Sequence, residues 1–214
     1  MEIIKRHIQK RINNPCEAMS PVGIILHYVG NPGTSAAANA NYFHNVNQRV
    51  SVNYVVDDRE IIEIIPPDMK SYGTSDGYYN GRYIQIEMCH PDASGRITDA
   101  TLERVVWLCR SLSARFGCAD VLRHYDVTGK RCPLWYVSHE DEWQVLKARI
   151  LSKAADDPAD AKKDAPPSDW AREAVSWAVE HGILRGDENG ALRLREAVTR
   201  EEAVTMMWRM RNMG

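Results

Sequence analysis

The sequence of 214 residues lacks both a long apolar run and an excess of either charge. No apolar stretch approaches the ~20 residues that a helix needs to cross a bilayer, so we expect no membrane span. Lys and Arg number 27 against 29 Asp and Glu, for a formal net charge of -2. That balance argues against a protein that binds nucleic acid mainly through phosphate contacts, because such binding requires a basic excess.

Cysteine is sparse, and its positions are scattered. The five are Cys16, Cys89, Cys109, Cys118 and Cys132. An odd count without regular spacing does not predict a disulfide framework, so we expect a reducing compartment and at least one free thiol. The start of the chain, MEIIKRHIQKRINN, is amphipathic and contains no apolar signal core. We therefore expect synthesis in the cytoplasm without a signal peptide, so that action outside the cell needs a separate release step.

The composition changes near Leu151. The stretch from Lys153 to Ser168 consists of Ala, Asp, Lys, Pro and Ser, and it contains no aromatic or large aliphatic residue. Such a segment cannot bury a core, which predicts a linker. The chain therefore divides into a main domain over residues 1–151, a linker over 152–168 and a short C-terminal module over 169–214.

The main domain alternates strand-like and helix-like segments. Short apolar or β-branched runs predict strands over Val22–Tyr28, Ser51–Val56, Glu60–Ile65, Tyr83–Met88 and Ala119–Leu122. The second and third of these runs are joined by a short polar segment, which predicts a hairpin. Composition and helical periodicity predict helices over Thr34–Val46, Asp99–Phe116 and Ser138–Leu151, the last with a cap at Ser138. This order predicts an α/β domain with helices packed on a sheet.

The C-terminal module is predicted to be a small all-α unit. An apolar face over Trp170–Glu180 indicates one helix, and Gly182 follows it as a stop. Thr199 and Glu202 have the spacing of a capping box for a second helix. We expect that second helix to bury Ala203, Met206, Met207 and Met210. A module of about 45 residues has a thin core, so we expect it to lean on a partner surface.

Two of the seven histidines stand out by their context. His27 ends an apolar strand, where an imidazole needs a partner, and His124 follows another strand in a loop that runs to Cys132. Two imidazoles and a thiolate can form three ligands of a tetrahedral zinc site whose fourth position is open for water. Spacing alone leaves the metal interpretation and a structural one evenly balanced. A structural or surface role is expected for His7, His44, His139 and His181. The context of His90 favours neither a structural nor a functional role.

The segment from Val22 to about Ile150 resembles the zinc-dependent N-acetylmuramoyl-L-alanine amidases of phage endolysins and bacterial autolysins, which are related in fold to animal peptidoglycan-recognition proteins. The matching pieces, in the family's order, are GIILHYVGNPGTSA at 23–36, Asn41–His44, Ser51–Asp57, Ile84–Cys89 and His124–Pro133. The last piece is the most specific. The resemblance implies a mixed central β-sheet flanked by helices.

The same resemblance implies Zn²⁺ as the cofactor, with His27, His124 and Cys132 as its ligands. It also implies a catalytic carboxylate at Glu87 and a cationic partner at Lys130. A carboxylate beside the metal can carry a proton from water to the leaving amine, and an ammonium group can stabilise an oxyanion. Taken without the resemblance, Glu87 reads as an exposed strand carboxylate and Lys130 as a solvated loop charge.

One position departs from the family's pattern, because many relatives carry His where this chain has Asn53. An amide cannot take up a proton near neutral pH, so we expect no catalytic role for Asn53. The loop Ser71–Gly81 is rich in Gly, Tyr and Ser and precedes the strand that carries the expected carboxylate. Its Tyr72 and Tyr78, together with Trp135, are expected to bind substrate as walls of a glycopeptide groove.

The C-terminal module resembles a single S-layer homology repeat. The matching residues are Trp170-Ala171, Ala174-Val175, Trp177-Ala178, Gly182-Ile183, Gly186, Gly190 and Val198–Glu202. In that family a Thr-Arg motif helps to bind acidic secondary cell-wall polysaccharide, which implies wall-binding roles for Trp170 and Arg200. Such repeats usually come in threes, whereas we find one. The alternative is a helical pair that packs on the main domain or self-associates into a homo-oligomer.

Together the resemblances imply a bacterial or phage cell-wall lytic enzyme. We expect it to hydrolyse the amide between N-acetylmuramic acid and L-alanine in peptidoglycan, as an endolysin that waits in the host cytoplasm and acts on the wall after release. Four alternatives stay open: a non-catalytic peptidoglycan-binding protein of the same fold, a bacterial autolysin, a muropeptide-recycling amidase, and an assembly protein whose main function lies in the S-layer-like module. We expect no nucleic-acid partner.

Overall fold

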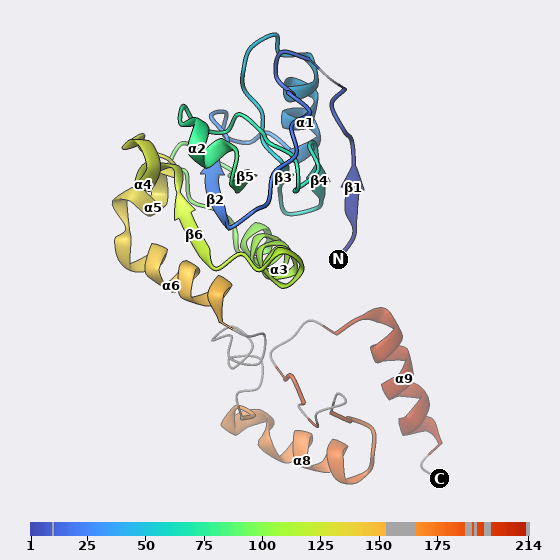
Figure 1. Ribbon diagram of the computed structural model, residues 1–214. Coiled ribbons are helices and arrows are strands. Elements are labelled where there is room, and N and C mark those ends of the chain that lie inside the picture. The colour runs from blue at the N-terminus through green and yellow to red at the C-terminus, as the bar shows by residue number, and fades with distance from the viewer. Residues whose placement is uncertain (10, 153–165, 187–189, 191, 195–197, 213–214) are drawn as a thin grey trace. The chain divides into compact units, whose positions relative to one another are not determined.

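The computed structural model describes residues 1–9, 11–152, 166–186, 190, 192–194 and 198–212. The chain divides into two compact units, Met1–Leu151 and Ser152–Gly214, and each is described by itself (Figure 1). Most of the predicted linker, residues 153–165, lies outside the described residues. Among the residues described, no helix has the length and apolar character of a membrane span.

A mixed sheet of six strands forms the centre of the N-terminal unit, in the order β1-β4-β3-β5-β2-β6. Its strands are β1 (Ile3–Lys5), β2 (Gly23–Tyr28), β3 (Tyr54–Val56), β4 (Ile61–Glu63), β5 (Tyr83–Met88) and β6 (Asp120–Arg123). The pair β3 and β4 is antiparallel, as predicted for the hairpin, and the other four pairings are parallel. The five predicted strands are confirmed, and β1 is an addition at one edge.

The helices of this unit are α1 (Ala36–Asn45), α2 (Gly77–Asn80), α3 (Asp99–Phe116), α4 (His124–Thr128), α5 (Leu134–Ser138) and α6 (Glu140–Leu151). The predicted bounds of α3 are confirmed. Thr98 caps the helix at its start, and Gly117 ends it in the left-handed conformation, with a φ of 72°. The predicted start of α6 is wrong. Ser138 is the last residue of α5, and His139 breaks the helical path with φ -130° and ψ 77° before α6 begins.

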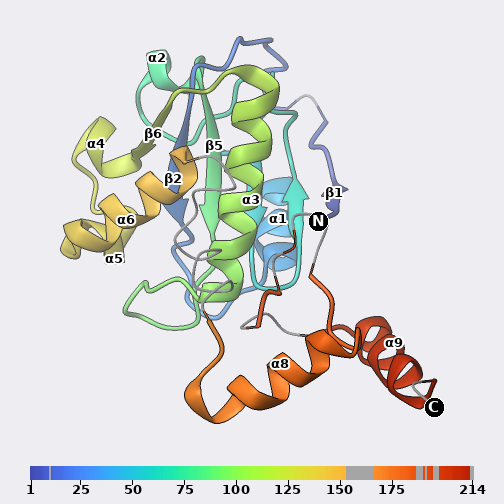
Figure 2. The same ribbon diagram turned by 90° about the horizontal axis from the view of Figure 1, so that it is seen from below.

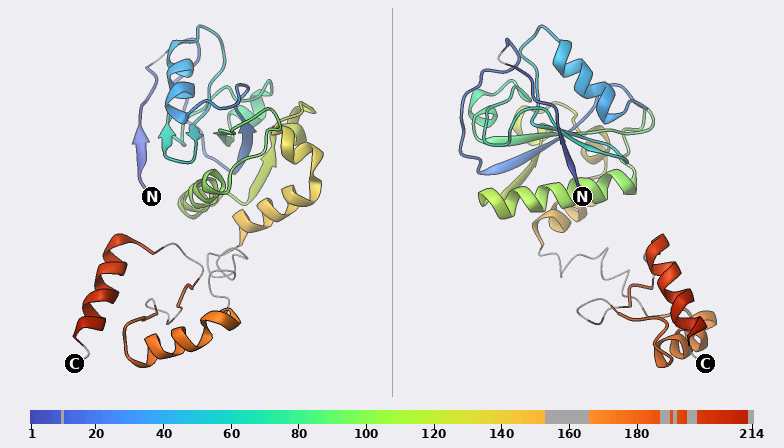
Figure 3. Two further views of the ribbon diagram at one scale, coloured as in Figure 1. Left: turned by 180° about the vertical axis from the view of Figure 1, so that it is seen from behind. Right: turned by 90° about the vertical axis from the view of Figure 1, so that its right-hand side faces the viewer.

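The helices cover both faces of the sheet. α3 crosses one face and α1 lies on the other (Figures 2 and 3). Leu26 and Ile86 pack with α3, whereas Val55 packs with α1 in a second cluster. Because side chains alternate along a strand, the registered pair His27 and Glu87 shares its face with Val55, away from α3. The polar residues of β2 and β5 therefore gather on the face that carries α1.

The C-terminal unit contains η2 (Asp169–Ala171), α8 (Arg172–Glu180) and α9 (Arg200–Arg211). Both predicted helices are confirmed. The predicted capping box is also present, because Glu202 N–H donates to Thr199 Oγ1 at 3.2 Å and Thr199 N–H donates to Glu202 Oε2 at 2.7 Å. The expected burial is wrong, since Met207 and Met210 are exposed by 58% and 55% and neither helix buries a residue. Ala203 and Met206 are half-buried. Two short helices have too little surface to enclose one another.

Candidate metal centre

Three potential metal ligands meet in the N-terminal unit. The Nδ1 atoms of His27 and His124 lie 3.0 Å apart, and Cys132 Sγ lies 3.9 Å from His27 Nδ1. One ligand atom of each residue lies within 4.8 Å of the others, and all three side chains are buried. The fold therefore assembles the three residues that the resemblance implied as ligands.

Strand pairing explains why residues 97 positions apart in the sequence meet. The parallel neighbours β2 and β6 end at the same edge of the sheet, where His27 and His124 lie. The chain then turns through α4 and returns, so that the Cys132 carbonyl accepts a hydrogen bond from Tyr125 N–H at 2.9 Å. This return brings the thiol back beside the two imidazoles.

Burial sets the protonation of the cluster. It lowers the pKa of His27 to about 3, with help from His124, and lowers the pKa of His124 to about 4, with help from the charge of Lys130. Burial and the nearby Glu87 carboxyl raise the pKa of the Cys132 thiol to about 12. The imidazoles are thus neutral and ready to coordinate, whereas the thiol releases its proton when a cation binds.

The donor set fits zinc. Zinc is held by imidazole nitrogen at about 2.0–2.1 Å and by thiolate sulfur at about 2.3 Å in tetrahedral sites. Those bond lengths keep ligand atoms roughly 3.3–3.6 Å apart. The observed separations of 3.0 and 3.9 Å fall on either side of that range, so small side-chain movements suffice. Calcium and magnesium prefer oxygen ligands, which this cluster does not offer.

Glu87 and Lys130 act on the same cluster. Glu87 lies opposite His27 in the register of β5 and β2. Its Oε2 atom is buried and has no hydrogen-bond partner within the described part of the chain. Burial raises the pKa of Glu87 to about 8, and the charge of Lys130 opposes that rise. The exposed Lys130 also helps to lower the pKa of both imidazoles. A buried carboxyl oxygen without a partner is available to an incoming ligand or water.

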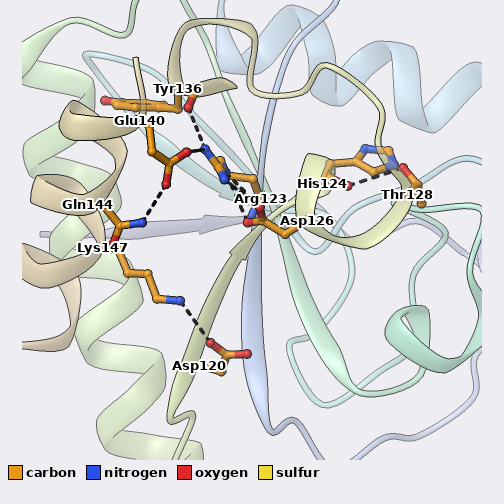
Figure 4. Close-up of polar contacts among 9 residues, drawn as sticks. All are labelled: Asp120, Arg123, His124, Asp126, Thr128, Tyr136, Glu140, Gln144 and Lys147. Carbon is orange, nitrogen blue, oxygen red and sulfur yellow. Dashed lines mark hydrogen bonds and ion pairs between the residues drawn. The ribbon is translucent and has the colours of Figure 1, made fainter. Parts of the chain in front are cut away.

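The buried side chain of Arg123 forms a network of polar contacts beside the cluster (Figure 4). Its side chain is only 7% exposed, and it pairs with Asp126 at 2.7 Å and with Glu140 at 2.6 Å. Nη1 also donates to the Tyr136 carbonyl at 2.8 Å, and the guanidinium lies 5.1 Å from the centre of the Trp143 ring. The group thereby joins the end of β6 to α4, α5 and α6.

The network around Arg123 lies next to two of the candidate metal ligands in the sequence. Arg123 directly precedes His124, and its partner carbonyl at Tyr136 follows Cys132 in α5. One guanidinium therefore holds both ends of the segment that carries two of the three candidate ligands. Sequence reasoning missed Arg123. An arginine at the end of a short apolar strand, with an acidic residue three positions later, was the available signal.

Gln85 is the other neighbour of the cluster that sequence reasoning missed. It is fully buried on β5, and its Oε1 atom lies 2.7 Å from His27 Nε2. The signal was a polar side chain inside the apolar run YIQIEM, whose register with β2 is visible only in the folded sheet.

Asn53 is held by hydrogen bonds within the fold, and its lack of a catalytic role stays a prediction. Its Oδ1 accepts hydrogen bonds from Ser71 Oγ at 3.0 Å and from Gln85 N–H at 2.9 Å. Its Nδ2 donates to the carbonyls of Pro66 and Met69, each at 3.0 Å. The amide therefore links β5 to the loop that follows β4.

The two tyrosines expected in a substrate groove lie in different surroundings. Tyr78 is 59% exposed, with the Arg82 guanidinium 4.8 Å from its ring centre. Tyr72 is half-buried, and the cationic groups of Arg49 and Lys70 each lie 5.8 Å from its ring centre. Both rings are within reach of solvent, and their substrate contacts stay predictions.

Trp135, the third expected groove residue, is tied into α5 and α6. Its ring stacks on His139 with the centroids 3.8 Å apart, and its Nε1 donates to Glu142 at 2.8 Å. In the C-terminal unit, Trp170 is 88% exposed and Arg200 is the exposed first residue of α9. The roles proposed for these three residues also stay predictions.

The other histidines contact groups outside the metal cluster. The ring nitrogens of His90 lie 2.8 and 2.7 Å from the carbonyls of Val29 and Asp92, which indicates a structural anchor. The remaining contacts are His7 with Glu63, His44 with the Arg6 carbonyl, His139 with the Trp135 carbonyl and His181 with the Trp177 carbonyl.

Comparison with known proteins agrees with this fold. Residues 17–135 match the Amidase_2 family, described as N-acetylmuramoyl-L-alanine amidase, and residues 163–204 match the S-layer homology domain. The chain therefore belongs to the Amidase_2 family.

Two curated relatives are N-acetylmuramoyl-L-alanine amidases. CwlL of Bacillus licheniformis is 30% identical over an alignment of 147 residues that covers 61% of this chain and 41% of the relative. XlyA of Bacillus subtilis (strain 168) is 34% identical over 144 residues, 64% of this chain and 47% of the relative. The match thus spans less than half the length of each of these relatives.

Solved structures are similar to the N-terminal part of the chain. The catalytic domain of XlyA has a TM-score of 0.62 and 30% identity, and the match covers 71% of this chain and 100% of that one. PlyL has a TM-score of 0.65 and 26% identity, with coverage of 71% and 98%. The predicted mixed sheet flanked by helices is therefore confirmed as the fold of these proteins.

Proposed function

We propose that this chain is a zinc-dependent N-acetylmuramoyl-L-alanine amidase that acts on peptidoglycan as an endolysin. It hydrolyses the amide between the lactyl group of N-acetylmuramic acid and L-alanine. The observation that carries the proposal is the buried cluster of His27, His124 and Cys132, with Glu87 on the neighbouring strand, whose Oε2 has no partner among the described residues. The names of the curated relatives and the family match support it.

Each residue has one task in this proposal. His27, His124 and Cys132 hold the ion, and the thiolate leaves the site less positive than a third imidazole would. Bound zinc supplies a Lewis acid that lowers the pKa of water toward ~7 and polarises a carbonyl. Glu87 accepts a proton and delivers it to the leaving amine, a task suited to a carboxyl whose pKa is raised toward neutrality. The ammonium group of Lys130 stabilises negative charge that develops on the scissile oxygen.

The C-terminal module is proposed to hold the enzyme on the wall. Exposed Trp170 offers an aromatic face, and Arg200 offers a planar fork that pairs with carboxylates of a secondary cell-wall polysaccharide. The S-layer homology match over residues 163–204 supports this role. Tethering of this kind raises the effective concentration of substrate around the catalytic unit.

Product analysis tests the proposal. Purified peptidoglycan is digested with the full chain, and the soluble products are identified by mass spectrometry. We expect stem peptides with a free L-alanine amine and glycan strands with a free lactyl carboxyl, together with about one zinc per chain by elemental analysis. Products cut within the glycan or within the peptide, or full activity in zinc-free protein, would contradict it.

A further inference from the structure

The side chain of Gln85 is placed to control one candidate ligand. It is fully buried on β5, and its Oε1 atom lies 2.7 Å from His27 Nε2. On the other side of the His27 ring, Nδ1 faces His124 Nδ1 at 3.0 Å and Cys132 Sγ at 3.9 Å. The two ring nitrogens of His27 thus have different neighbours, an amide on one side and the ligand cluster on the other.

The contact determines which ring nitrogen of His27 carries the proton. The Gln85 amide nitrogen donates to the Tyr83 carbonyl at 3.3 Å, which turns Oε1 toward the imidazole. An amide oxygen only accepts hydrogen bonds, so His27 Nε2 must be the donor. A neutral imidazole with its proton on Nε2 has its lone pair on Nδ1, which is the atom that faces the cluster.

The surrounding backbone leaves room for this amide. A Cβ atom at Gly73 would lie 2.6 Å from Gln85 Oε1 and 2.8 Å from its Cδ. Contacts that short force one of the two groups to move, so the absence of a side chain at Gly73 is what permits the observed position of the amide. By contrast, a Cβ at Gly77, four residues further along, would meet no heavy atom within 4 Å.

The main chain of Gln85 is fixed as firmly as its side chain. Asn53 N–H donates to the Gln85 carbonyl at 3.0 Å, and Gln85 N–H donates to Asn53 Oδ1 at 2.9 Å. Ser71 Oγ donates to the same Oδ1 at 3.0 Å, which links the loop that contains Gly73 to this point. An amide held on all sides is the kind of neighbour that fixes the orientation of a metal-binding imidazole.

We propose that Gln85 is a positioning residue for His27, which it holds with the proton on Nε2 and the lone pair of Nδ1 directed at the metal. Gly73 supplies the space that this arrangement requires. The inference rests on the metal site of the proposed function. It adds two residues that hold no metal themselves and that determine how one ligand is presented.

Zinc affinity of the full chain, measured by competition with a chelating dye, is the first readout. Gln85→Met keeps the size of the side chain and removes the acceptor, and we expect it to weaken zinc binding by ~10–100-fold. Gly73→Ala should weaken it in the same direction, whereas the matched control Gly77→Ala should bind zinc like the wild type. The control Ile86→Val, on the opposite face of β5, should lower the melting temperature without changing zinc affinity.

A double-mutant cycle separates the proposed contact from general damage. Gly73→Ala should weaken zinc binding in the wild-type background and have no further effect in a Gln85→Ala background, because the shortened side chain leaves room for the added methyl group. Equal effects of Gly73→Ala in both backgrounds would show that the glycine acts through something other than Gln85, and would overturn its part of the proposal.

The tautomer of His27 is the readout that a merely structural role would not move. Nitrogen NMR of the metal-free full chain should show a protonated Nε2 in the wild type and a mixture of tautomers in Gln85→Met. Zinc affinity within twofold of the wild type, or an unchanged tautomer, in a folded Gln85→Met variant would overturn the proposal. A wild-type chain without zinc affinity would instead overturn the proposed metal site, and the two failures are thereby distinguished.

Discussion

The two units of the chain use burial in opposite ways. The N-terminal unit encloses polar groups such as His27, Gln85 and Arg123 and gives each a partner. Among the described residues of the C-terminal unit, Ile183 alone is buried, and large side chains such as Trp170 lie in solvent. Enclosure shifts pKa values and fixes geometry, as chemistry requires, whereas exposure leaves aromatic and basic groups free for a large ligand. The comparison predicts that the two units respond independently to change.

The largest effect should come from the loss of a ligand. We expect Cys132→Ala to weaken zinc binding by more than the ~100-fold typical of outer-shell changes, and to abolish hydrolysis of peptidoglycan. Zinc content and product release measure both. Cys16→Ser, at an exposed cysteine of the same unit, is the matched control and should change neither. A Cys132→Ala chain that keeps its zinc would remove Cys132 from the site.

A somewhat smaller effect should follow when the chemistry is removed and the metal is left. Glu87→Gln keeps the shape of the side chain but cannot accept a proton, so we expect turnover to fall by ~10²–10⁴ with zinc affinity within a few-fold of the wild type. Steady-state rates on soluble muropeptides measure the loss. Glu17→Gln, at an exposed glutamate, should retain full turnover. Near-normal rates for Glu87→Gln would contradict its role.

Substitutions of Arg123 test whether its buried guanidinium stabilises the N-terminal unit. Arg123→Met removes the guanidinium that donates to the Tyr136 carbonyl and leaves Asp126 only the hydrogen bond from the backbone N–H of residue 123. We therefore expect a loss of about 2–4 kcal/mol and a fall of about 5–10 °C in the melting temperature of the N-terminal unit. Arg123→Lys should not restore stability, because an ammonium cannot replace the planar fork. Glu140→Gln should have a much smaller effect, since that carboxylate lies in solvent. Equal losses for the Arg123 and Glu140 variants would contradict the importance of the buried guanidinium.

How far the sequence predicts this molecule depends on the range of each interaction. Apolar runs and helical periodicity predict the strands that flank the site and the whole of α3, because those patterns are local. β1 is only three residues long and needs its partner β4 to be recognised. The candidate ligands came from a family resemblance, and the roles of Glu87 and Lys130 stay predictions.

Sequence patterns could not identify the residues that support the ligands. Gln85 meets His27 across 58 positions, and Arg123 meets Glu140 across 17. Such contacts exist only after the sheet has paired and α6 has docked. The C-terminal burial was mispredicted for a related reason. Periodicity identifies an apolar face on α9 but does not supply the surface that would cover it.

A smaller effect, visible in metal-free protein, concerns pH. Burial raises the pKa of Glu87 from 4.5 to about 8. The folded state therefore binds an extra proton between these values, and the resulting stability is complete below pH ~4.5 and lost as the pH rises through ~8. Glu87→Gln cannot lose that proton, so we expect the metal-free variant to be more stable than the wild type at pH 9, by on the order of 4 kcal/mol, and similar at pH 5. Denaturation followed by near-ultraviolet circular dichroism measures this, and a constant difference at the two pH values would contradict it.

Removal of residues 152–214 should have the smallest effect. We expect unchanged zinc affinity, unchanged turnover of soluble muropeptides and slower lysis of intact walls by less than about tenfold, because only the tether is lost. A truncated chain that lyses walls at the full rate would contradict a targeting role.

Light scattering tests the further prediction that the full chain self-associates through its exposed module while the truncated chain is a monomer.

The strand order has a consequence for the dynamics of the sheet. β6 is the last strand, and β2 is its partner in the sheet. An edge strand held by one ladder is free to fray and to slip, and a slip of one residue reverses every side chain. An ion held by His27 at the end of β2 and by His124 just after β6 would fix the register of that edge. Zinc should therefore slow hydrogen exchange at the β6 amides more than at those of β1, the edge strand on the opposite side.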